Sequence, residues 1–294
     1  MSLTAVGSIA FDSVKTPFGE RERMLGGSAV HFSLAASFFS EVHVVGPVGD
    51  DFGEGELAVL EDHGVATEDI ERVEGGKTFF WRGHYDYDLN TAHTDDTQLN
   101  VFGDFEPKLS DASRAADILF LANIQPDLQR QVRAQCDARF AALDSMNMWI
   151  ETARDSLLAA IAEVDCVIIN DAEIRELTQE PNLARAARTV TGMGPRAVVA
   201  KQGEYGAALF TESGFFALPG YPLEDVCVII GPPVDCQENF PQSDEKGLWL
   251  ADLPVAGGLS WTFNFSKPGY ELAIKKATSS APGEQIINVV LQPK

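Results

Sequence analysis

The segment "ARDSLLAAIAEVDCVIINDAEIREL", residues 153–177, decides the fold class. Its centre, "DCVIIND" (165–171), is a short apolar run bounded by polar residues, which predicts a strand buried on both faces of a sheet. Apolar residues recur at helical spacing before it, and a second helical segment follows it. A buried strand between two helices predicts right-handed crossovers and a mainly parallel sheet.

The same alternation extends over the first 226 residues, so the predicted fold class is α/β, with helices flanking a mainly parallel sheet. The other strand-like runs are "LTAVGSIAF" (3–11), "EVHVVGPVG" (41–49), "ADILFLANI" (116–124), "RFAALDSM" (139–146) and "RAVVAKQG" (196–203). The other helix-like segments are "GGSAVHFSLAASFF" (26–39), "FGEGELAVLEDHG" (52–64), "DLQRQVRAQC" (127–136) and "EPNLARAARTV" (180–190).

One segment departs from this pattern. In "KTFFWRGHYDYDLNTAH" (77–93), aromatic and apolar residues alternate with charged and polar ones. A period of two predicts strands with one face in water. The segment is interpreted either as a small sheet that stands off the main body and acts as a lid, or as an edge hairpin without a function.

The overall charge excludes two classes of partner. The formal net charge is −22, which opposes binding to nucleic acids and to membrane surfaces because both are polyanionic. No apolar run approaches the ~20 residues that span a bilayer. The start "MSLTAVGSIAFD" lacks the basic segment of a secretory signal, and the four cysteines form no CxxC pair. We therefore expect a cytoplasmic protein.

The chain changes character after residue 226. All 13 arginines lie in 1–226, whereas 227–294 contains five lysines and no arginine. Helical patterning also nearly vanishes there, and "GLSWTFNFSKPGYELAIKKA" (258–277) predicts strands or irregular structure. The sequence therefore predicts two parts, 1–226 and an atypical segment 227–294 that either packs on the core or folds poorly.

Polar residues at predicted strand ends are the first candidates for a site. Asp12 follows the first apolar run, and the Gly26-Gly27 pair stands where a helix begins. A carboxylate at a strand end can accept hydrogen bonds from substrate hydroxyls, and glycines allow a backbone to approach a ligand closely. The structural alternatives are a turn residue and a tight turn into a helix.

Asn170 and Glu173 have the spacing of a capping box, which explains them structurally. The alternative is that they face phosphates and magnesium-bound water at the strand end. Lys201, Gly203 and Gly206 lie in "AKQGEYGAALF" (200–210), which predicts a strand, a turn and a strand. The sequence has neither a phosphate loop nor a dinucleotide fingerprint, and its five histidines form no HExxH-type pair, so we predict no metal site built by the protein alone.

Taken in order, these segments resemble the PfkB or ribokinase-like family of carbohydrate and nucleoside kinases. The resemblance covers about residues 1–226. It is carried by "VGSIAFD" (6–12), "LGGSAVHFSLA" (25–35), "VGPVGDDFGEGELAVLEDHGV" (45–65), "KTFFWRGHYDYD" (77–88), "LDSMNMW" (143–149), "NDAEIREL" (170–177) and "VVAKQGEYGAALF" (198–210).

The resemblance implies a three-layer ribokinase-like α/β core with a small β-sheet lid, whose strands lie within about 12–25 and 77–102. It implies Mg²⁺-assisted transfer of the γ-phosphoryl group of ATP to a hydroxyl of a small sugar or nucleoside, with a homodimer through the lid as a further option. Asp12, Gly26, Gly27 and His31 would then bind the substrate. The nucleotide and phosphates would contact Asn170, Glu173 (which could also orient Mg²⁺-bound water), Lys201, Gly203 and Gly206.

Two departures bear on substrate and turnover. The family usually has Asn at the fourth position after the second glycine, where this chain has His31. The family also places a DxxGAGD motif after a strand such as "YPLEDV" (221–226), where glycine N–H groups bind the transferred phosphoryl group and the last Asp is the base. This chain has "CVIIGPPVDC" (227–236), in which Pro232 and Pro233 lack N–H groups. Asp235 is the one candidate base there, but its position does not assign that role.

Two functions therefore remain open. One is an ATP-dependent sugar or nucleoside kinase. The other is a catalytically impaired, kinase-derived ligand-binding protein, either a pseudokinase or a chain with a replaced C-terminus. A nucleotide-binding oxidoreductase would need a glycine fingerprint that the sequence lacks.

Overall fold

A computed structural model describes residues 1–87, 92–220, 227–230, 259–266 and 273–279. The chain divides into two compact units, residues 1–220 and 221–294. The sequence predicts this boundary at 226.

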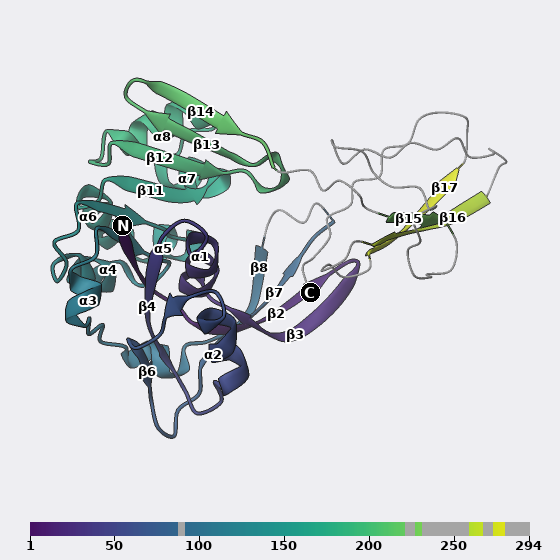
Figure 1. Ribbon diagram of the computed structural model, residues 1–294. Helices are drawn as coiled ribbons and strands as arrows, with labels where there is room; N and C mark the ends of the chain where they lie inside the picture. Colours follow the sequence, from purple (N-terminus) through teal and green to yellow (C-terminus); the bar gives the residue numbers. More distant parts are fainter. Residues whose placement is uncertain (88–91, 221–226, 231–258, 267–272, 280–294) are drawn as a thin grey trace. The chain divides into compact units, whose positions relative to one another are not determined.

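The first unit is built on a ten-stranded sheet (Figure 1). Nine strands follow the order β14-β13-β12-β11-β10-β9-β1-β4-β5, and β6 pairs with β4. All pairings are parallel except β12 with β13 and β13 with β14. The strands are β1 (Ser2–Val6), β4 (Glu41–Val48), β5 (Val65–Ala66), β6 (Ile70–Arg72), β9 (Ile118–Leu121), β10 (Phe140–Leu143), β11 (Cys166–Asn170), β12 (Ala197–Lys201), β13 (Ala207–Thr211) and β14 (Gly214–Leu218).

Helices lie on both faces of this sheet, which confirms the α/β prediction. One core cluster joins α4, α6, α7 and α8 to one face, and a second joins α1 and α2 to the other. The helices are α1 (Ser28–Ala36), α2 (Glu54–Glu61), α3 (Asp111–Arg114), α4 (Pro126–Arg133), α5 (Asn147–Thr152), α6 (Arg154–Ala162), α7 (Asp171–Thr178) and α8 (Leu183–Thr191). Short 3-10 turns lie at Asn100–Asp104 and Gly203–Tyr205.

The two faces of the strands are not equally buried. On β11, Val167 and Ile169 are fully buried against the helices α6 to α8, whereas Ile168 on the opposite face is only half-buried. Val199 on β12 is half-buried in the same way. The sequence predicts that these strands are buried on both faces, and the structure buries one face fully and the other only in part. The reason is that an uninterrupted apolar run does not distinguish a fully covered face from a partly covered one.

A separate four-stranded sheet forms beside this core, and we call it the lid sheet. Its order is β3-β2-β7-β8, with β2 (Ala10–Thr16), β3 (Gly19–Gly26), β7 (Phe79–Tyr85) and β8 (Ala92–Gln98). The alternating segment that begins at Lys77 thus forms β7 and continues into β8. Strand β2 runs parallel to β7, while the pairs β2–β3 and β7–β8 are antiparallel.

In the second unit, the described residues form an antiparallel sheet of β15 (Cys227–Ile230), β16 (Leu259–Ser266) and β17 (Ala273–Ser279). The strands predicted in 258–277 therefore form in part. The segment that contains Gly231, both prolines and Asp235 lies outside the described residues. No helix in the described part of the chain is long and apolar enough to cross a membrane.

Candidate active site

Asp12 lies in the lid sheet, not directly after the first strand as the sequence predicts. Strand β1 ends at Val6, and Asp12 is inside β2. The sequence hides the break because Ile9, Ala10 and Phe11 are as buried as the residues of β1, so the two strands form one apolar run. The carboxylate is therefore presented by the lid sheet.

Gly26 makes room for the Asp12 carboxylate. It is the last residue of β3 and pairs with Ala10 of β2. A Cβ atom built at position 26 would lie 2.1 Å from Oδ2 of Asp12, far inside van der Waals contact. Any side chain at this position would therefore displace the carboxylate.

Gly27 connects the lid sheet to α1. It is the N-cap of this helix, with φ of 96°, and a Cβ atom there would lie 2.3 Å from the carbonyl oxygen of Ser8. Its backbone N–H donates a hydrogen bond to the Asp12 carboxylate. The tight turn predicted from Gly26-Gly27 is thus present, and it holds Asp12 in place.

The surroundings of Asp12 set its charge. Burial raises the pKa of the Asp12 carboxyl, while His31 and the N–H of Gly27 act in the opposite direction. His31 lies in the first half of α1 and is exposed. Burial and the Asp12 charge also raise the pKa of Tyr85, at the end of β7. Asp12 therefore interacts electrostatically with His31 of α1 and with Tyr85 at the end of β7.

A second group of polar residues lies at the carboxyl ends of three neighbouring strands of the main sheet. Asp144 directly follows β10, Asn170 ends β11 and Lys201 ends β12. Ligands bind at this edge in open parallel sheets. The Nζ atom of Lys201 lies 3.0 Å from Oδ1 of Asp144, in an ion pair whose carboxylate is largely buried.

Asn170 and Glu173 form the predicted capping box at the start of α7. The side-chain Oδ1 of Asn170 accepts a hydrogen bond from the N–H of Glu173 at 2.7 Å, and Oε2 of Glu173 accepts one from the N–H of Asn170 at 2.8 Å. The structural interpretation of this motif is confirmed. It also fixes the direction of the Glu173 side chain at the strand end.

Glu173 is electrostatically coupled to the ion pair. Burial raises the pKa of Glu173 to about 7, the N–H of Asn170 and the charge of Lys201 lower it, and the charge of Asp144 raises it. Burial also raises the pKa of Asp144, against the effect of Lys201. Two carboxyl groups and one ammonium group thus lie together at this edge, and we call Asp144, Glu173 and Lys201 the strand-end cluster.

Gly203 and Gly206 shape the turn between β12 and β13. Both have positive φ, 57° and 90°, and the N–H of Gly206 donates to the carbonyl of Gly203 at 3.0 Å. A Cβ atom at Gly206 would lie 2.1 Å from the carbonyl oxygen of Leu218. The predicted strand, turn and strand are confirmed, and contact of this turn with a nucleotide stays a prediction.

Tyr85 and Asp144 are not among the candidate residues predicted from the sequence. Asp144 carries the same signal as Asn170, a polar residue directly after a buried apolar run, and this signal could have identified it. Tyr85 has no such signal, since only the pairing of β7 with β2 brings it near Asp12.

Comparisons with known proteins agree with this architecture. A curated cytidine kinase from Thermococcus kodakarensis is 24% identical over 231 residues, which cover 76% of this chain and 81% of that protein. The solved nucleoside kinase of Methanocaldococcus jannaschii, an archaeal member of the ribokinase family, superposes with a TM-score of 0.60 at 14% identity, covering 76% of this chain and 78% of that one. Arabidopsis thaliana ribokinase, solved with ribose and ATP, gives a TM-score of 0.58 at 20% identity, covering 75% and 78%.

The fold is therefore ribokinase-like, as the resemblance in sequence implies. The family model described as "pfkB family carbohydrate kinase" matches residues 4–228, which include the lid sheet, Asp12 and the strand-end cluster. This chain belongs to the pfkB family of carbohydrate kinases.

Proposed function

We propose that this protein is an ATP-dependent kinase that transfers the γ-phosphoryl group to a hydroxyl of a sugar or nucleoside. The observation that carries the proposal is the Asp12 carboxylate, held over Gly26 by the N–H of Gly27. A small polyol is recognised by buried acceptors for its hydroxyl protons, and a carboxylate fixed in this way is such an acceptor.

The acceptor would bind between the lid sheet and the start of α1. Asp12 would accept hydrogen bonds from its hydroxyls, and His31 would offer a donor or an acceptor at the position where the family usually has Asn. Tyr85 would add an aromatic wall and one hydroxyl. Because His31 is larger than Asn, we expect an acceptor that differs from the family's usual sugars at the group that contacts this residue.

The strand-end cluster would serve the donor side. Carboxylate oxygens are the protein ligands that Mg²⁺ prefers, directly or through water, so Asp144 and Glu173 fit a magnesium–nucleotide complex. When bound with ATP, Mg²⁺ would supply charge neutralisation on the transferred phosphoryl group. Lys201 would place a positive charge near the phosphates, and the turn at Gly203 and Gly206 would lie beside the nucleotide.

The relatives support the substrate classes. The curated relative is a cytidine kinase, and the Arabidopsis ribokinase was solved with ribose and ATP. We infer a nucleoside or pentose as acceptor, ATP as donor, and the cytoplasm, where ATP is available, as the compartment. A homodimer through the lid sheet stays a prediction.

One observation favours the alternative, a kinase-derived protein that binds ligands without turnover. The family match ends at residue 228, and the next residues contain two prolines where the reaction needs N–H donors. Asp235 is the remaining candidate for the base. In this alternative, acceptor binding at Asp12 persists while transfer is lost.

The two functions are separated by measuring ADP release from Mg-ATP across a panel of nucleosides, pentoses and hexoses, together with binding of each compound by calorimetry. An active kinase releases ADP with one class of acceptor, and Asp12→Asn abolishes both this release and acceptor binding. Asp62→Asn, an exposed carboxylate at the end of α2, is the matched control and should change neither.

Background ADP release with every acceptor, combined with binding that depends on Asp12, would exclude the kinase and support the binding protein. Absence of both turnover and binding would exclude both functions. If binding persists without turnover, restoring a Gly-Ala-Gly-Asp segment after Val226 should restore transfer. A restored chain that folds and stays inert would show that loss of this motif is not the cause.

A further inference from the structure

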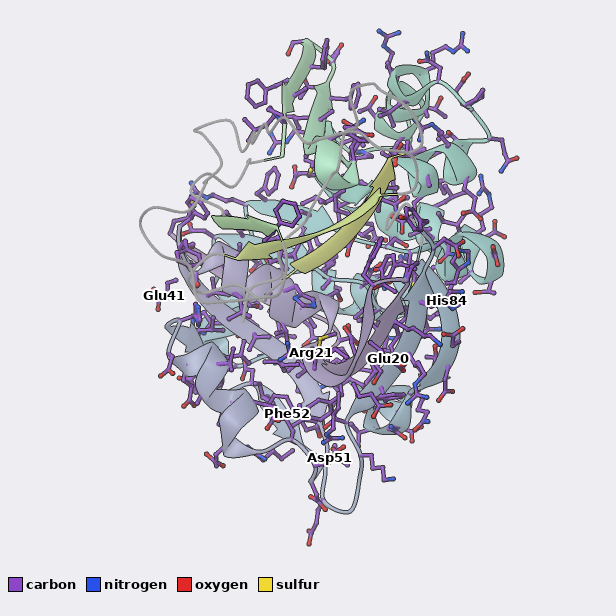
Figure 2. The ribbon with its side chains drawn as sticks, turned by 90° about the vertical axis from the view of Figure 1, so that its right-hand side faces the viewer. Glu20, Arg21, Glu41, Asp51, Phe52 and His84 are labelled. Atoms are coloured by element: carbon purple, nitrogen blue, oxygen red, sulfur yellow. The ribbon has the colours of Figure 1, made fainter. Side chains whose placement is uncertain are left out.

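The lid sheet carries a histidine–aspartate cluster that the kinase reaction does not use. The five histidines have no metal-binding spacing along the sequence, but the pairing of β7 with β8 brings two of them together. One ligand atom each of His84, Asp86 and His93 lie within 4.8 Å of one another. We call these three residues the lid cluster, and His84 is labelled in Figure 2.

The strand register explains the cluster. His84 and His93 are directly opposite each other in the antiparallel pair, and their rings stack with centroids 4.9 Å apart. Asp86 is the first residue after β7 and follows His84 by two residues, so it lies beside the two histidines where the strand ends. Its Oδ2 lies 3.1 Å from Nε2 of His93.

A fourth residue orients the first histidine. Oδ1 of Asp95 lies 2.8 Å from Nδ1 of His84. Asp95 sits where the β7–β8 register shifts, so it is an extra residue of β8 that no residue of β7 faces. A carboxylate on one ring nitrogen fixes the imidazole and leaves the other nitrogen, here Nε2, for a ligand.

We propose that the lid cluster binds one divalent transition-metal ion of the Zn²⁺ class. Two imidazoles and one carboxylate form a donor set that suits Zn²⁺, whereas Mg²⁺ prefers oxygen ligands alone. Three protein ligands with an open fourth position make a complete zinc coordination when water fills the remaining site. In a tetrahedral site the ligand atoms are about 3.4 Å apart, so rotations of exposed side chains suffice to close the cluster.

The nearby charges favour a cation. Asp86 and Asp95 each contribute a carboxylate, and Lys15, opposite His84 on β2, is the one basic residue in direct register with the cluster among the described residues. The protein as a whole carries a net charge of −22. The local field and the overall field therefore both attract a divalent ion.

The cluster lies on the opposite face of the lid sheet from the acceptor site. In the β2–β7 register Asp12 pairs with Trp81, so Trp81 and Tyr85 share the face of Asp12, whereas His84 lies on the other. A bound ion would cross-link β7 to β8 without contacting the substrate. The proposal therefore stands independently of the kinase activity.

The test uses the full chain, purified without a polyhistidine tag, freed of metal with a chelator and titrated with Zn²⁺ in excess Mg²⁺. We expect one ion per chain, and a rise in Tm as Zn²⁺ is added. His84→Ala and His93→Ala should each weaken Zn²⁺ binding by about tenfold or more, and Asp95→Asn by less, because it acts through His84. His63→Ala, an exposed histidine after α2, is the control and should leave binding unchanged.

Asp86→Asn keeps the shape of the side chain, so it tests the cluster even if a histidine variant fails to fold by circular dichroism. Co²⁺ in place of Zn²⁺ identifies the donors by its absorption spectrum. Visible bands without a thiolate charge-transfer band support the lid cluster. A thiolate band, or Zn²⁺ binding that survives in Asp86→Asn and in the folded histidine variants, would overturn the proposal.

Discussion

Lys201 and Asp144 form an ion pair across the ends of β12 and β10, with 3.0 Å between Nζ and Oδ1. The strand between them, β11, ends in Asn170, so the pair spans the point where α7 begins. The Asp144 side chain is 14% exposed and that of Lys201 is 47% exposed. The cation is therefore partly in water, while its partner depends on it for charge compensation.

Lys201→Met should destabilise the first unit by about 1–2 kcal/mol, because it leaves a nearly buried carboxylate without a partner, an effect moderated by solvent around the lysine. Adding Asp144→Asn should recover part of this loss. Urea unfolding of both single variants and the double variant measures the coupling, and Lys108→Met, an exposed lysine, is the control. Strictly additive losses would contradict an interaction between the two residues.

Glu173 should make stability fall as the solution becomes alkaline. Its pKa is about 7 in the folded protein, above the usual 4.5, so its contribution is fully present below pH ~4.5 and is lost as the pH rises through ~7. Glu173→Gln, which stays neutral, should therefore gain stability relative to the wild type over this range, by an amount on the order of 3 kcal/mol at most. Thermal unfolding at several pH values measures the difference.

Glu68→Gln, which changes an exposed glutamate, is the control. Its stability should follow that of the wild type at every pH. A Glu173→Gln variant that also runs parallel would show that Glu173 has an ordinary pKa in the folded protein.

Alanine at Gly26 and alanine at Gly27 should have different effects. Gly26→Ala meets only the side chain of Asp12 and no backbone atom, so it should displace the carboxylate, and we expect acceptor binding to weaken by about tenfold or more with little loss of stability. Gly27→Ala meets the backbone of Ser8 at a positive φ, so it should destabilise the fold by about 1–3 kcal/mol. Calorimetry and urea unfolding measure the two effects.

Gly55→Ala is the control for both, since nothing lies within 4 Å of its Cβ position inside α2. It should stabilise the protein by up to about 1 kcal/mol. If Gly26→Ala binds the acceptor normally, the carboxylate does not contact it.

Thr78 should prove important for the junction between the core and the lid sheet. Its buried hydroxyl donates to Oδ1 of Asp51 at 2.7 Å and accepts from the N–H of Gly49 at 3.0 Å. Thr78→Val removes both bonds and should cost about 1–3 kcal/mol, whereas Thr97→Val on the exposed part of β8 should cost little. Chemical unfolding of the two variants compares them. Equal losses would show that the junction contributes nothing special.

The hydrogen bond between Thr78 and Asp51 should also affect how the stability of the protein depends on pH. Burial acts to raise the pKa of Asp51, but hydrogen bonds from Thr78 and the charge of Arg23 outweigh it, so the pKa is lowered. A lowered carboxyl pKa stabilises the fold above pH ~3.8 and this stabilisation is lost as the pH falls through the folded value. The loss of stability in Thr78→Val, relative to the wild type, should therefore be largest near neutral pH and smaller in acid. Chemical unfolding at neutral and at acidic pH measures this difference.

The fold could be predicted from the sequence because the pattern that distinguishes strands from helices lies within each short segment. Runs such as residues 166–170 lie between helices, and the spacing of apolar residues separates the two kinds of element without knowledge of distant contacts. The prediction for Asp12 was wrong, because Ile9 to Phe11 continue the apolar character of β1 into a different sheet. Burial alone does not record which sheet a strand joins.

The site could be predicted only where the residues in contact are close together in the sequence. Asn170 and Glu173 are three residues apart, and their spacing identified the capping box. Lys201 and Asp144 are 57 residues apart, and their pairing follows from the order of the strands. His84 and His93 meet only because a hairpin returns β8 along β7, which no fixed motif spacing records.

The capping box at Asn170 has a further consequence for any ligand at the strand ends. One oxygen of the Glu173 carboxylate is engaged by the backbone N–H of Asn170 as soon as α7 forms, and this leaves the other oxygen in a set direction. The side-chain entropy of this group is therefore already lost when the chain folds. A bound ion or phosphate would meet a pre-organised carboxylate, and the cost of ordering it belongs to folding and not to binding.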